Sequence, residues 1–402
     1  MPAQVINMVI KNQSEMKDGN IRNILRTMLW NAPISRADLC KKTGLTPSAV
    51  SALIRELLEI RVIQELGPDS QKNQGVGRPP SLLQLRANSY AAAGAEIGAN
   101  YLSLGVLDLT GEMQDTMIEK IAPGEQPESV FDQITCYVAK QDSQLKEKRA
   151  KLVGLGVAVT GLVDTKRGIN RFAPNLGWRD INVTEELSSR LSIPVVVDNN
   201  VRLMALGEQW FGNARDSGGL IFVQVGAGVG CGIVLPGIGL LRGAFDGGGE
   251  LGHCTVLPGG PVCKCGKQGC LEALISERAL VSAYLRRTAI HSETAGDPRS
   301  LSVDTIVEAA NQGDIDATSV LREAAEFLGI GLATLVNILE PSQIVLNGNA
   351  FALSPLTRTW ICESTQRHRF SSEENIELSD ATFKGHQGMV GAATAALQQE
   401  IF

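Results

Sequence analysis

The sequence of 402 residues lacks any apolar run close to the roughly 20 residues that a helix needs to cross a bilayer. Its first twenty residues also lack the basic start and the apolar stretch of a secretory signal. Both absences argue against membrane insertion and export, so we expect a protein of the cytoplasm. The length favours two or three domains, because one hydrophobic core rarely serves a chain of this size.

An overall excess of positive charge is also missing, since 43 Asp and Glu outnumber 37 Lys and Arg and give a net charge of −6. By itself this disfavours a nucleic-acid partner. The charge is unevenly distributed, however, because residues 1–86 hold 12 basic and 7 acidic side chains, a net of +5, and leave −11 for the remainder. A basic module fused to an acidic body is typical of a DNA-binding head on a ligand-binding trunk.

The basic module shows the signals of two helices separated by a short turn. Apolar residues recur at helical spacing over residues 21–29 and predict a first amphipathic helix. Ser35 is followed three residues later by Asp38, as at a helix N-terminus, so a second helix is predicted over about residues 36–42. Gly44 is expected to end this helix.

A third helix is predicted after Thr46, which caps it, and Pro47, whose missing N–H costs nothing at the first helical position. Two short helices joined by a glycine turn form a helix-turn-helix. The apolar side chains of the third helix form a predicted buried stripe: Val50, Leu53, Ile54 and Leu57. The predicted DNA contacts are side chains on its other faces and residues that begin the helices: Arg36, Thr46, Ser48, Ser51, Ala52 and Arg55.

A β-hairpin is predicted next, with strands at residues 62–66 and 81–85. Its tip, QKNQGVGRPP, is rich in glycine and carries Lys72 and Arg78, which suit contacts with phosphates or a narrow minor groove. We therefore predict a winged helix-turn-helix over residues 1–87 that binds DNA. The alternative is a small group of helices that packs against a partner protein.

Two stretches of the remaining chain, residues 91–113 and 219–241, look like distant copies of one another. Each consists of an apolar strand, a turn with glycine and a second apolar strand, followed by alternating strand and helix signals such as the helix at about 201–210. A repeated hairpin in an α/β chain predicts a duplicated two-lobe fold with a cleft between the lobes. In kinases of this shape such turns hold phosphates through backbone N–H groups.

The pattern His253-x9-Cys263-x-Cys265-x4-Cys270 gathers three thiols and one imidazole within a short segment. This is a preferred tetrahedral ligand set for zinc, and the intervening Gly and Pro let the chain wrap around an ion. Four protein ligands leave no open position for water, so we predict a structural zinc ion. Cys254 is an alternative to its neighbour His253, and reduced thiols or a redox pair in a flexible loop are the other interpretation.

With these residues in view, the sequence resembles the ROK family of repressors, open reading frames and kinases, and its repressor branch in particular. The resemblance covers residues 15–402 and is carried by SRADLCKKTGLTPSAVS, the GRP of the wing, and E-L-G-H followed by C-K-C-G-K-Q-G-C-L-E. It implies an α/β, actin-like and sugar-kinase-like domain, ribonuclease H-like and duplicated, over residues 88–402. Lobe 1 is expected at about 88–202 with a C-terminal helix at about 388–402, and lobe 2 at about 203–387.

The resemblance also implies a sugar site. In ROK kinases the sugar is held by the Asn of P-N-L, an N-D pair, the Glu and His of E-x-G-H, and the Glu after the last zinc cysteine. Carboxylates and amides suit sugar hydroxyls because they form hydrogen bonds in a fixed geometry. A turn Asn or a capping Glu is the structural alternative for any single residue. The matching residues in this chain are Asn175, Asn199, Asn200, Glu250, His253 and Glu272.

The phosphoryl-transfer residues of the ROK kinases are altered in this chain. The aspartate that takes the proton from the attacking hydroxyl is replaced by Asn200, and an amide cannot act as that base. The first phosphate turn, D-x-G-x-T in the kinases, is EIGAN at residues 96–100, and the second, GAGVG at 226–230, has lost its hydroxyl. Arg202 replaces another polar residue. A sugar site without a transfer apparatus predicts binding without catalysis, so no catalytic residue is expected.

The sequence therefore predicts a transcriptional repressor of carbohydrate genes that binds a palindromic double-stranded DNA operator and responds to a sugar or sugar phosphate. Such an effector acts by favouring one arrangement of the lobes. The resemblance implies a homodimer or larger homo-oligomer, whose symmetry matches a palindrome. The alternatives are a functional sugar kinase with an added DNA-binding head, and a repressor controlled by docking to a sugar-transport protein.

Overall fold

The computed structural model describes residues 2–68, 81–122, 124–215, 219–291, 301–370 and 377–402. The chain divides into two compact units, the first made of Met1–Asp198 with Gly388–Phe402 and the second of Asn199–Gln387. The chain therefore passes from one unit to the other twice. No helix within the described ranges is long and apolar enough to cross a membrane.

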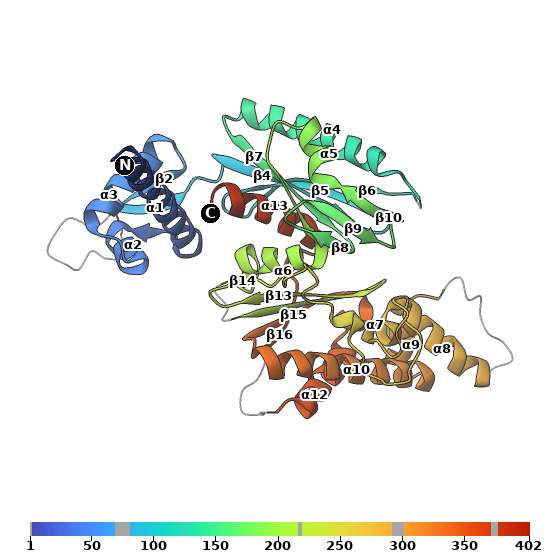
Figure 1. The fold of residues 1–402 in the computed structure, drawn as a ribbon. Helices are drawn as coiled ribbons and strands as arrows, with labels where there is room; N and C mark the ends of the chain where they lie inside the picture. The colour runs from blue at the N-terminus through green and yellow to red at the C-terminus, as the bar shows by residue number, and fades with distance from the viewer. Residues whose placement is uncertain (1, 69–80, 123, 216–218, 292–300, 371–376) are drawn as a thin grey trace. The chain divides into compact units, whose positions relative to one another are not determined.

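The head begins the first unit and combines helices with a small sheet of order β1-β3-β2 (Figure 1). Strand β3 pairs antiparallel with both of its neighbours, as in a hairpin with one added strand. The elements are α1 (Pro2–Asn31), β1 (Ile34–Ser35), α2 (Arg36–Thr43), α3 (Pro47–Glu59), β2 (Ile63–Pro68) and β3 (Ser81–Leu85).

The capping residues predicted for the head have the predicted roles. Ser35 accepts a hydrogen bond from the N–H of Asp38 at 3.2 Å, and Gly44 adopts the left-handed conformation, φ 72°, that ends α2. Thr46 caps α3 by accepting from the N–H of Ala49 at 3.3 Å. The whole predicted stripe of α3 is buried, and with the hairpin beside it the head is a winged helix-turn-helix.

Helix α1 is longer than the predicted segment 21–29. Among the residues of this helix whose burial is described, 15–31, the buried ones are Ile24, Leu25 and Met28, and they lie within the segment that showed apolar periodicity. The periodicity therefore marked residues of α1 that pack against the rest of the head.

The rest of the first unit is built on a mixed five-stranded sheet of order β11-β7-β4-β5-β6. Helices α4 and α5 cover one face of this sheet and α13 covers the other (Figure 1). The elements are β4 (Tyr90–Ile97), β5 (Tyr101–Asp108), β6 (Met113–Lys120), α4 (Pro127–Glu147), β7 (Lys151–Val159), α5 (Val183–Arg190), β11 (Val195–Asn199) and α13 (Gln387–Glu400). A separate small sheet contains β8 (Leu162–Asp164), β9 (Ile169–Ala173) and β10 (Trp178–Asn182).

The second unit is built on a five-stranded sheet of order β14-β13-β12-β15-β16. Helix α6 packs on one face and the remaining helices on the other. The strands are β12 (Leu220–Val225), β13 (Val229–Leu235), β14 (Gly239–Leu240), β15 (Gln343–Gly348) and β16 (Glu377–Asp380). The helices are α6 (Asn200–Phe211), η2 (Leu251–His253), α7 (Leu271–Ile275), α8 (Glu277–His291), α9 (Val303–Asn311), α10 (Ile315–Leu339), α11 (Ala350–Leu353) and α12 (Pro355–His368).

The two large sheets have the same topology, which confirms the predicted duplication. In each, the first strand of a hairpin lies at the centre, pairs antiparallel with the second strand, and pairs parallel with a later strand on its other side. The helix that follows the last strand of each sheet packs on the other sheet: α6 follows β11 and packs on β12 and β13, whereas α13 follows β16 and packs on the first sheet.

Helix α13 lies in direct contact with the backbone of the first sheet. A Cβ atom added to Gly156 of β7 would lie 1.7 Å from the carbonyl oxygen of Ala392, and one on Gly94 of β4 would lie 2.1 Å from that of Met389. Side chains at these two positions would therefore push the helix off the sheet. The contact fixes α13 on the first unit.

We predict that Gly156→Ala lowers the free energy of unfolding by about 1–3 kcal/mol or more, because the added methyl group overpacks the contact between β7 and α13. Gly19→Ala is the matched control. Gly19 is an exposed residue of α1 with no atom near its would-be Cβ, so the same substitution there should stabilise by about 0.5–1 kcal/mol. Urea unfolding of the full chain measures both changes, and equal stability of the Gly156 variant and the parent would contradict this account.

Candidate metal centre and ligand-binding residues

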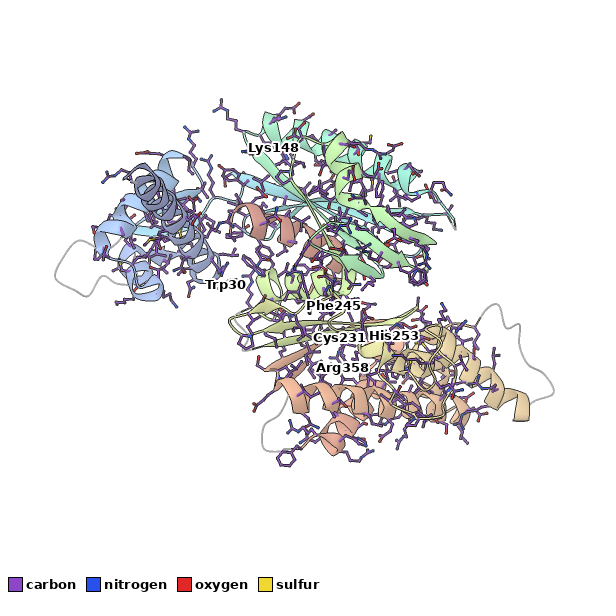
Figure 2. The ribbon with its side chains drawn as sticks, in the orientation of Figure 1. Trp30, Lys148, Cys231, Phe245, His253 and Arg358 are labelled. Atoms are coloured by element: carbon purple, nitrogen blue, oxygen red, sulfur yellow. The ribbon has the colours of Figure 1, made fainter. Side chains whose placement is uncertain are left out.

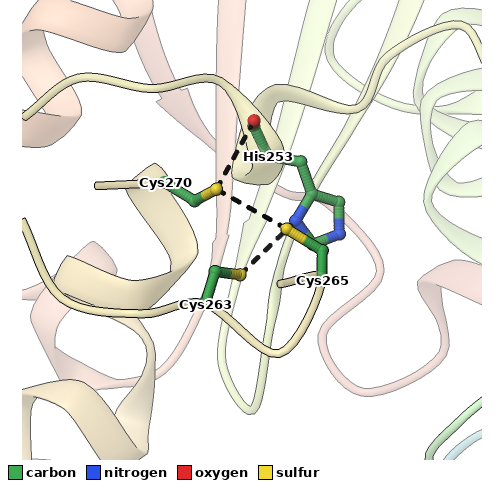
Figure 3. Close-up of side chains that lie close together, drawn as sticks. All are labelled: His253, Cys263, Cys265 and Cys270. Carbon is green, nitrogen blue, oxygen red and sulfur yellow. Dashed lines mark hydrogen bonds between the residues drawn. The ribbon is translucent and has the colours of Figure 1, made fainter. Parts of the chain in front are cut away.

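The four predicted metal ligands, His253, Cys263, Cys265 and Cys270, are brought together in the second unit, and their ligand atoms all lie within 4.8 Å of one another (Figure 3). The Sγ of Cys263 is 3.7 Å from Nδ1 of His253, and the sulfurs of Cys265 and Cys270 are also 3.7 Å apart. Zinc–sulfur bonds of about 2.3 Å at tetrahedral angles place neighbouring sulfurs about 3.8 Å apart. The side chains therefore fit a tetrahedral metal ion.

Short-range backbone structure arranges these ligands. His253 ends the 3₁₀ turn η2, and Cys270 immediately precedes α7. Between them a tight turn is closed by the N–H of Cys263 donating to the carbonyl of Lys267 at 2.8 Å. This turn brings Cys263 and Cys265 to the same side of the loop, where a single ion can reach both.

The electrostatics of the cluster also favour a cation. Desolvation raises the pKa of the Cys270 thiol to about 12 and also raises the pKa of Cys263, whereas a backbone N–H from Lys267 lowers the pKa of Cys265. Three thiolates close together are stable only beside a positive charge, which a bound metal ion supplies.

Cys254, the predicted alternative ligand, lies outside this cluster. Its side chain is exposed and its Sγ is 3.7 Å from the carbonyl oxygen of Glu250. The neighbouring His253 instead has its ring beside the thiols. Of the two candidates for the fourth ligand, the geometry therefore favours His253.

The predicted sugar residues Asn199 and Asn200 lie where the chain enters the second unit. The side-chain oxygen of Asn199 accepts hydrogen bonds from the N–H groups of Val201 at 3.0 Å and Arg202 at 3.2 Å, so it caps α6. Asn200, the first residue of α6, is half-buried.

Glu272 and Glu250 lie beside the metal ligands in sequence and structure. Glu272 is on α7, and its Oε2 accepts a hydrogen bond from the N–H of Val229 in the second glycine turn at 3.1 Å. Glu250 is exposed and directly precedes η2, the turn that ends at His253. Glu272 is thus hydrogen-bonded to the second glycine turn, and Glu250 adjoins the short turn that ends at the candidate metal ligand His253.

Asn175 belongs to the first unit, unlike the other predicted sugar residues. It is exposed in the turn between β9 and β10, next to the buried Leu176.

The first glycine turn contains a feature that sequence analysis missed. Tyr101 donates a hydrogen bond from its hydroxyl to Oε1 of the buried Glu96 at 2.6 Å. Its ring lies so close to Gly98 that a Cβ there would be 2.3 Å from the ring. Burial and the Glu96 carboxylate both raise the pKa of Tyr101, so the hydroxyl remains a donor. The ring therefore occupies space directly beside this turn.

Arg202 is buried near the start of α6, and its guanidinium donates to the carbonyl oxygen of Asp246 at 2.5 Å. The residue before Asp246 is Phe245, which is 92% exposed in the loop between β14 and η2 (Figure 2). Arg202 thus ties this loop to the helix that begins with Asn200. The sequence marked Arg202 as unusual, but its partner lies 44 residues away and gave no signal.

The predicted DNA contacts on the head differ in how accessible they are. Ser48, Ala52 and Arg55 are exposed on α3 and Ser51 is half-buried. Thr46 is exposed, although its hydroxyl is engaged as the α3 cap. Arg36 forms an exposed ion pair with Glu65 at 2.8 Å. Lys72 and Arg78 of the predicted wing lie outside the described residues.

Comparison with known proteins finds a family match for each of two parts of the chain. The profile of the ROK family matches residues 92–399, and that of a winged helix-turn-helix DNA-binding domain matches residues 17–64. The xylose repressor of Bacillus subtilis strain 168 is 30% identical over 352 residues, which cover 87% of each chain.

Two solved structures are similar to this chain in fold. A ROK family transcriptional regulator, a homologue of the Escherichia coli Mlc protein, has a TM-score of 0.79 over 95% of this chain and 98% of its own, at 24% identity. A ROK family glucokinase from Streptomyces griseus, solved with glucose and AMPPNP, has a TM-score of 0.66 and 32% identity over 77% of this chain and 99% of its own. The regulator thus corresponds to nearly the whole chain, whereas the glucokinase corresponds to 77% of it.

We predict that Cys265→Ser removes bound metal and lowers the thermal midpoint by about 5–10 °C, because a structural ion contributes folding free energy and each kcal/mol shifts the midpoint by a few degrees. Cys254→Ser is the matched control, since that thiol is exposed and outside the cluster. Metal analysis of the purified protein and calorimetry provide the measurements. Purified parent protein without metal would refute the assignment.

Proposed function

This chain belongs to the ROK family, and we propose that it is a DNA-binding repressor of carbohydrate-metabolism genes whose operator binding is controlled by a sugar or sugar phosphate. The observation that carries the proposal is a winged helix-turn-helix joined to a kinase-like trunk in which the position of the catalytic base holds Asn200. The head supplies the DNA contact and the trunk supplies the effector site.

The head recognises DNA through α3 in the major groove, with Ser48, Ser51, Ala52 and Arg55 toward the bases or backbone. The exposure of Ser48, Ala52 and Arg55 supports this role. Arg36 reaches the phosphate backbone by exchanging its exposed partner Glu65 for a phosphate, and an exposed ion pair is weak enough to allow this. Lys72 and Arg78 contribute as the wing, and Thr46 positions α3 as its cap.

The effector binds to Asn175, Asn199, Asn200, Glu250, His253 and Glu272. Nδ1 of His253 faces the thiols, which leaves Nε2 for a sugar hydroxyl. A metal ligand whose other ring nitrogen binds a second partner is held in one orientation, so the ion and the sugar fix the same ring. The ion is a structural zinc, supported by three sulfurs and one nitrogen at tetrahedral spacing.

The trunk binds its sugar without phosphorylating it. Asn200 supplies no basic carboxylate, and the ring of Tyr101 beside Gly98 occupies space that a nucleotide phosphate at the first turn requires. Both features oppose catalysis. The protein acts in the cytoplasm, where its DNA target lies, as a homodimer or larger homo-oligomer on a palindromic operator.

A gel shift on the upstream region of the protein's own gene, challenged with sugars and sugar phosphates including D-xylose, tests the DNA target and the effector together. We expect a specific complex that one of these compounds alters. Binding that ignores every compound but is lost on adding membranes from sugar-fed cells would favour control by a sugar-transport protein instead. Absence of specific DNA binding would overturn the proposal.

We predict that Arg55→Ala weakens operator binding about fivefold or more, since one lost base contact is worth about 1–3 kcal/mol. Effector binding, measured by calorimetry, should remain unchanged because Arg55 lies on the head. Lys148→Ala is the control, a basic residue exposed at the end of α4 (Figure 2). Loss of both DNA and effector binding in the Arg55 variant would contradict the division of roles.

We also predict no transfer of phosphate from ATP to D-glucose or D-xylose, measured by coupled detection of ADP with a ROK glucokinase as the positive control. Asn200→Asp should remain inactive, because Tyr101 still lies against the first glycine turn. Turnover by the parent protein that disappears in Asn200→Ala would instead establish a kinase with an added head.

A further inference from the structure

Two arginines of the head reach the end of helix α13. Arg22 donates from its two terminal nitrogens to the carbonyl oxygens of Gln398 at 3.3 Å and Gln399 at 3.0 Å. Arg26 donates to the main-chain oxygen of Phe402 at 3.1 Å. These contacts join residues that are 376 or 377 positions apart in the sequence.

The two arginines are poorly suited to a helix that stands alone. They are four residues apart on α1, where like charges repel each other, and both are half-buried. Burial and the charge of Arg22 lower the pKa of Arg26. The end of α13 offsets this repulsion, because the last carbonyl groups of a helix carry partial negative charge and lack partners within the helix.

The end of α13 is well anchored. Phe402 is 1% exposed, and the N–H groups of Ile401 and Phe402 both donate to the carbonyl of Leu397. Along its length α13 lies against the glycines of β4 and β7, so it cannot shift without breaking the contacts with Gly94 and Gly156. A head attached to the end of α13 is therefore attached to the sheet of the first unit.

The other end of α13 lies at one of the two points where the chain crosses between the units. The second unit ends at Gln387, the first residue of α13, and the first unit resumes at Gly388. The carboxylate of Glu96 lies against Gly388, where a Cβ would be 2.2 Å from Cδ of Glu96. The other crossing point, between Asp198 and Asn199, adjoins the Asn199 and Asn200 pair proposed to bind the effector. One helix thus begins at a junction of the units and ends on the DNA-binding head.

We propose that Arg22 and Arg26 are positioning residues for DNA recognition, which hold the head in a fixed orientation on the first unit by capping the end of α13. This inference rests on the proposed function. The heads of an oligomer then bind only operators whose two half-sites have the matching separation. Any change that the effector causes in the units reaches the heads through α13. Without the two arginines the head loses these contacts with α13 and tolerates a wider range of half-site separations.

The test compares Arg22→Gln/Arg26→Gln with the full-length parent on two versions of the operator, one natural and one with about five extra base pairs, half a helical turn, between the half-sites. The parent should bind the lengthened operator at least about tenfold more weakly. The double variant should lose less than about threefold, while its affinity for a single half-site equals that of the parent. A protein that was merely unstable would lose affinity for the single half-site as well.

Two further variants serve as controls. Arg22→Lys/Arg26→Lys keeps the charge and the donors, so it should restore most of the spacing dependence. Lys140→Gln/Lys148→Gln removes two exposed positive charges from α4 of the same unit and should behave like the parent. Equal spacing dependence in the parent and the Gln variant would overturn the proposal, as would a parent that ignores the spacing.

Hydrogen exchange tests the contact without DNA. In the Gln variant the amides of residues 397–402 should exchange about tenfold faster than in the parent, the factor expected from loss of a charge-assisted hydrogen bond. Amides in the sheet of the second unit should be unchanged. If the parent binds no specific DNA but shows this difference, the proposed function fails and the contact with α13 stands; if exchange does not change, the positioning role fails.

Discussion

The close approach of two helices to the glycines of two sheets is the constraint on which the rest of the structure depends. Each large sheet is closed on one face by the helix that follows the last strand of the other sheet. Glycine is needed in β7 because the backbone of α13 lies where a Cβ would be. This exchange of helices joins the duplicated halves, since each half covers only one face of its sheet with helices that lie between its own strands in the chain.

The exchange also determines where the proposed ligand residues lie. Helix α6 begins at a passage between the units and brings Asn199, Asn200 and Arg202 onto the second sheet. The metal cluster fixes the loop that presents Glu250 and His253, and it adjoins the short helix that carries Glu272. An ion bound in that loop would therefore hold in place residues that are proposed to bind the effector.

The proposed absence of catalysis rests on a chemical feature and a steric one. Asn200 has no basic carboxylate, and this is visible in one letter of the sequence. The ring of Tyr101 beside Gly98 is a steric feature that only the structure shows. The hydrogen bond from Arg202 to the carbonyl oxygen of Asp246 likewise holds a loop in a way that the sequence did not indicate.

The sequence by itself determined the features that depend on neighbours in the chain. Helix caps such as Ser35 and Thr46, the stripe of α3 and the repeated hairpins were predicted correctly as local patterns, because each is decided by short-range spacing. The gathering of His253, Cys263, Cys265 and Cys270 was also predicted from their spacing within 18 residues. The hydrogen bond of Tyr101 to Glu96, the hydrogen bond of Arg202 to Asp246, and the contacts of Arg22 and Arg26 with the end of α13 were decided only by the tertiary structure. These contacts depend on which elements meet after the sheets assemble, and such meetings leave no periodic signal in the sequence.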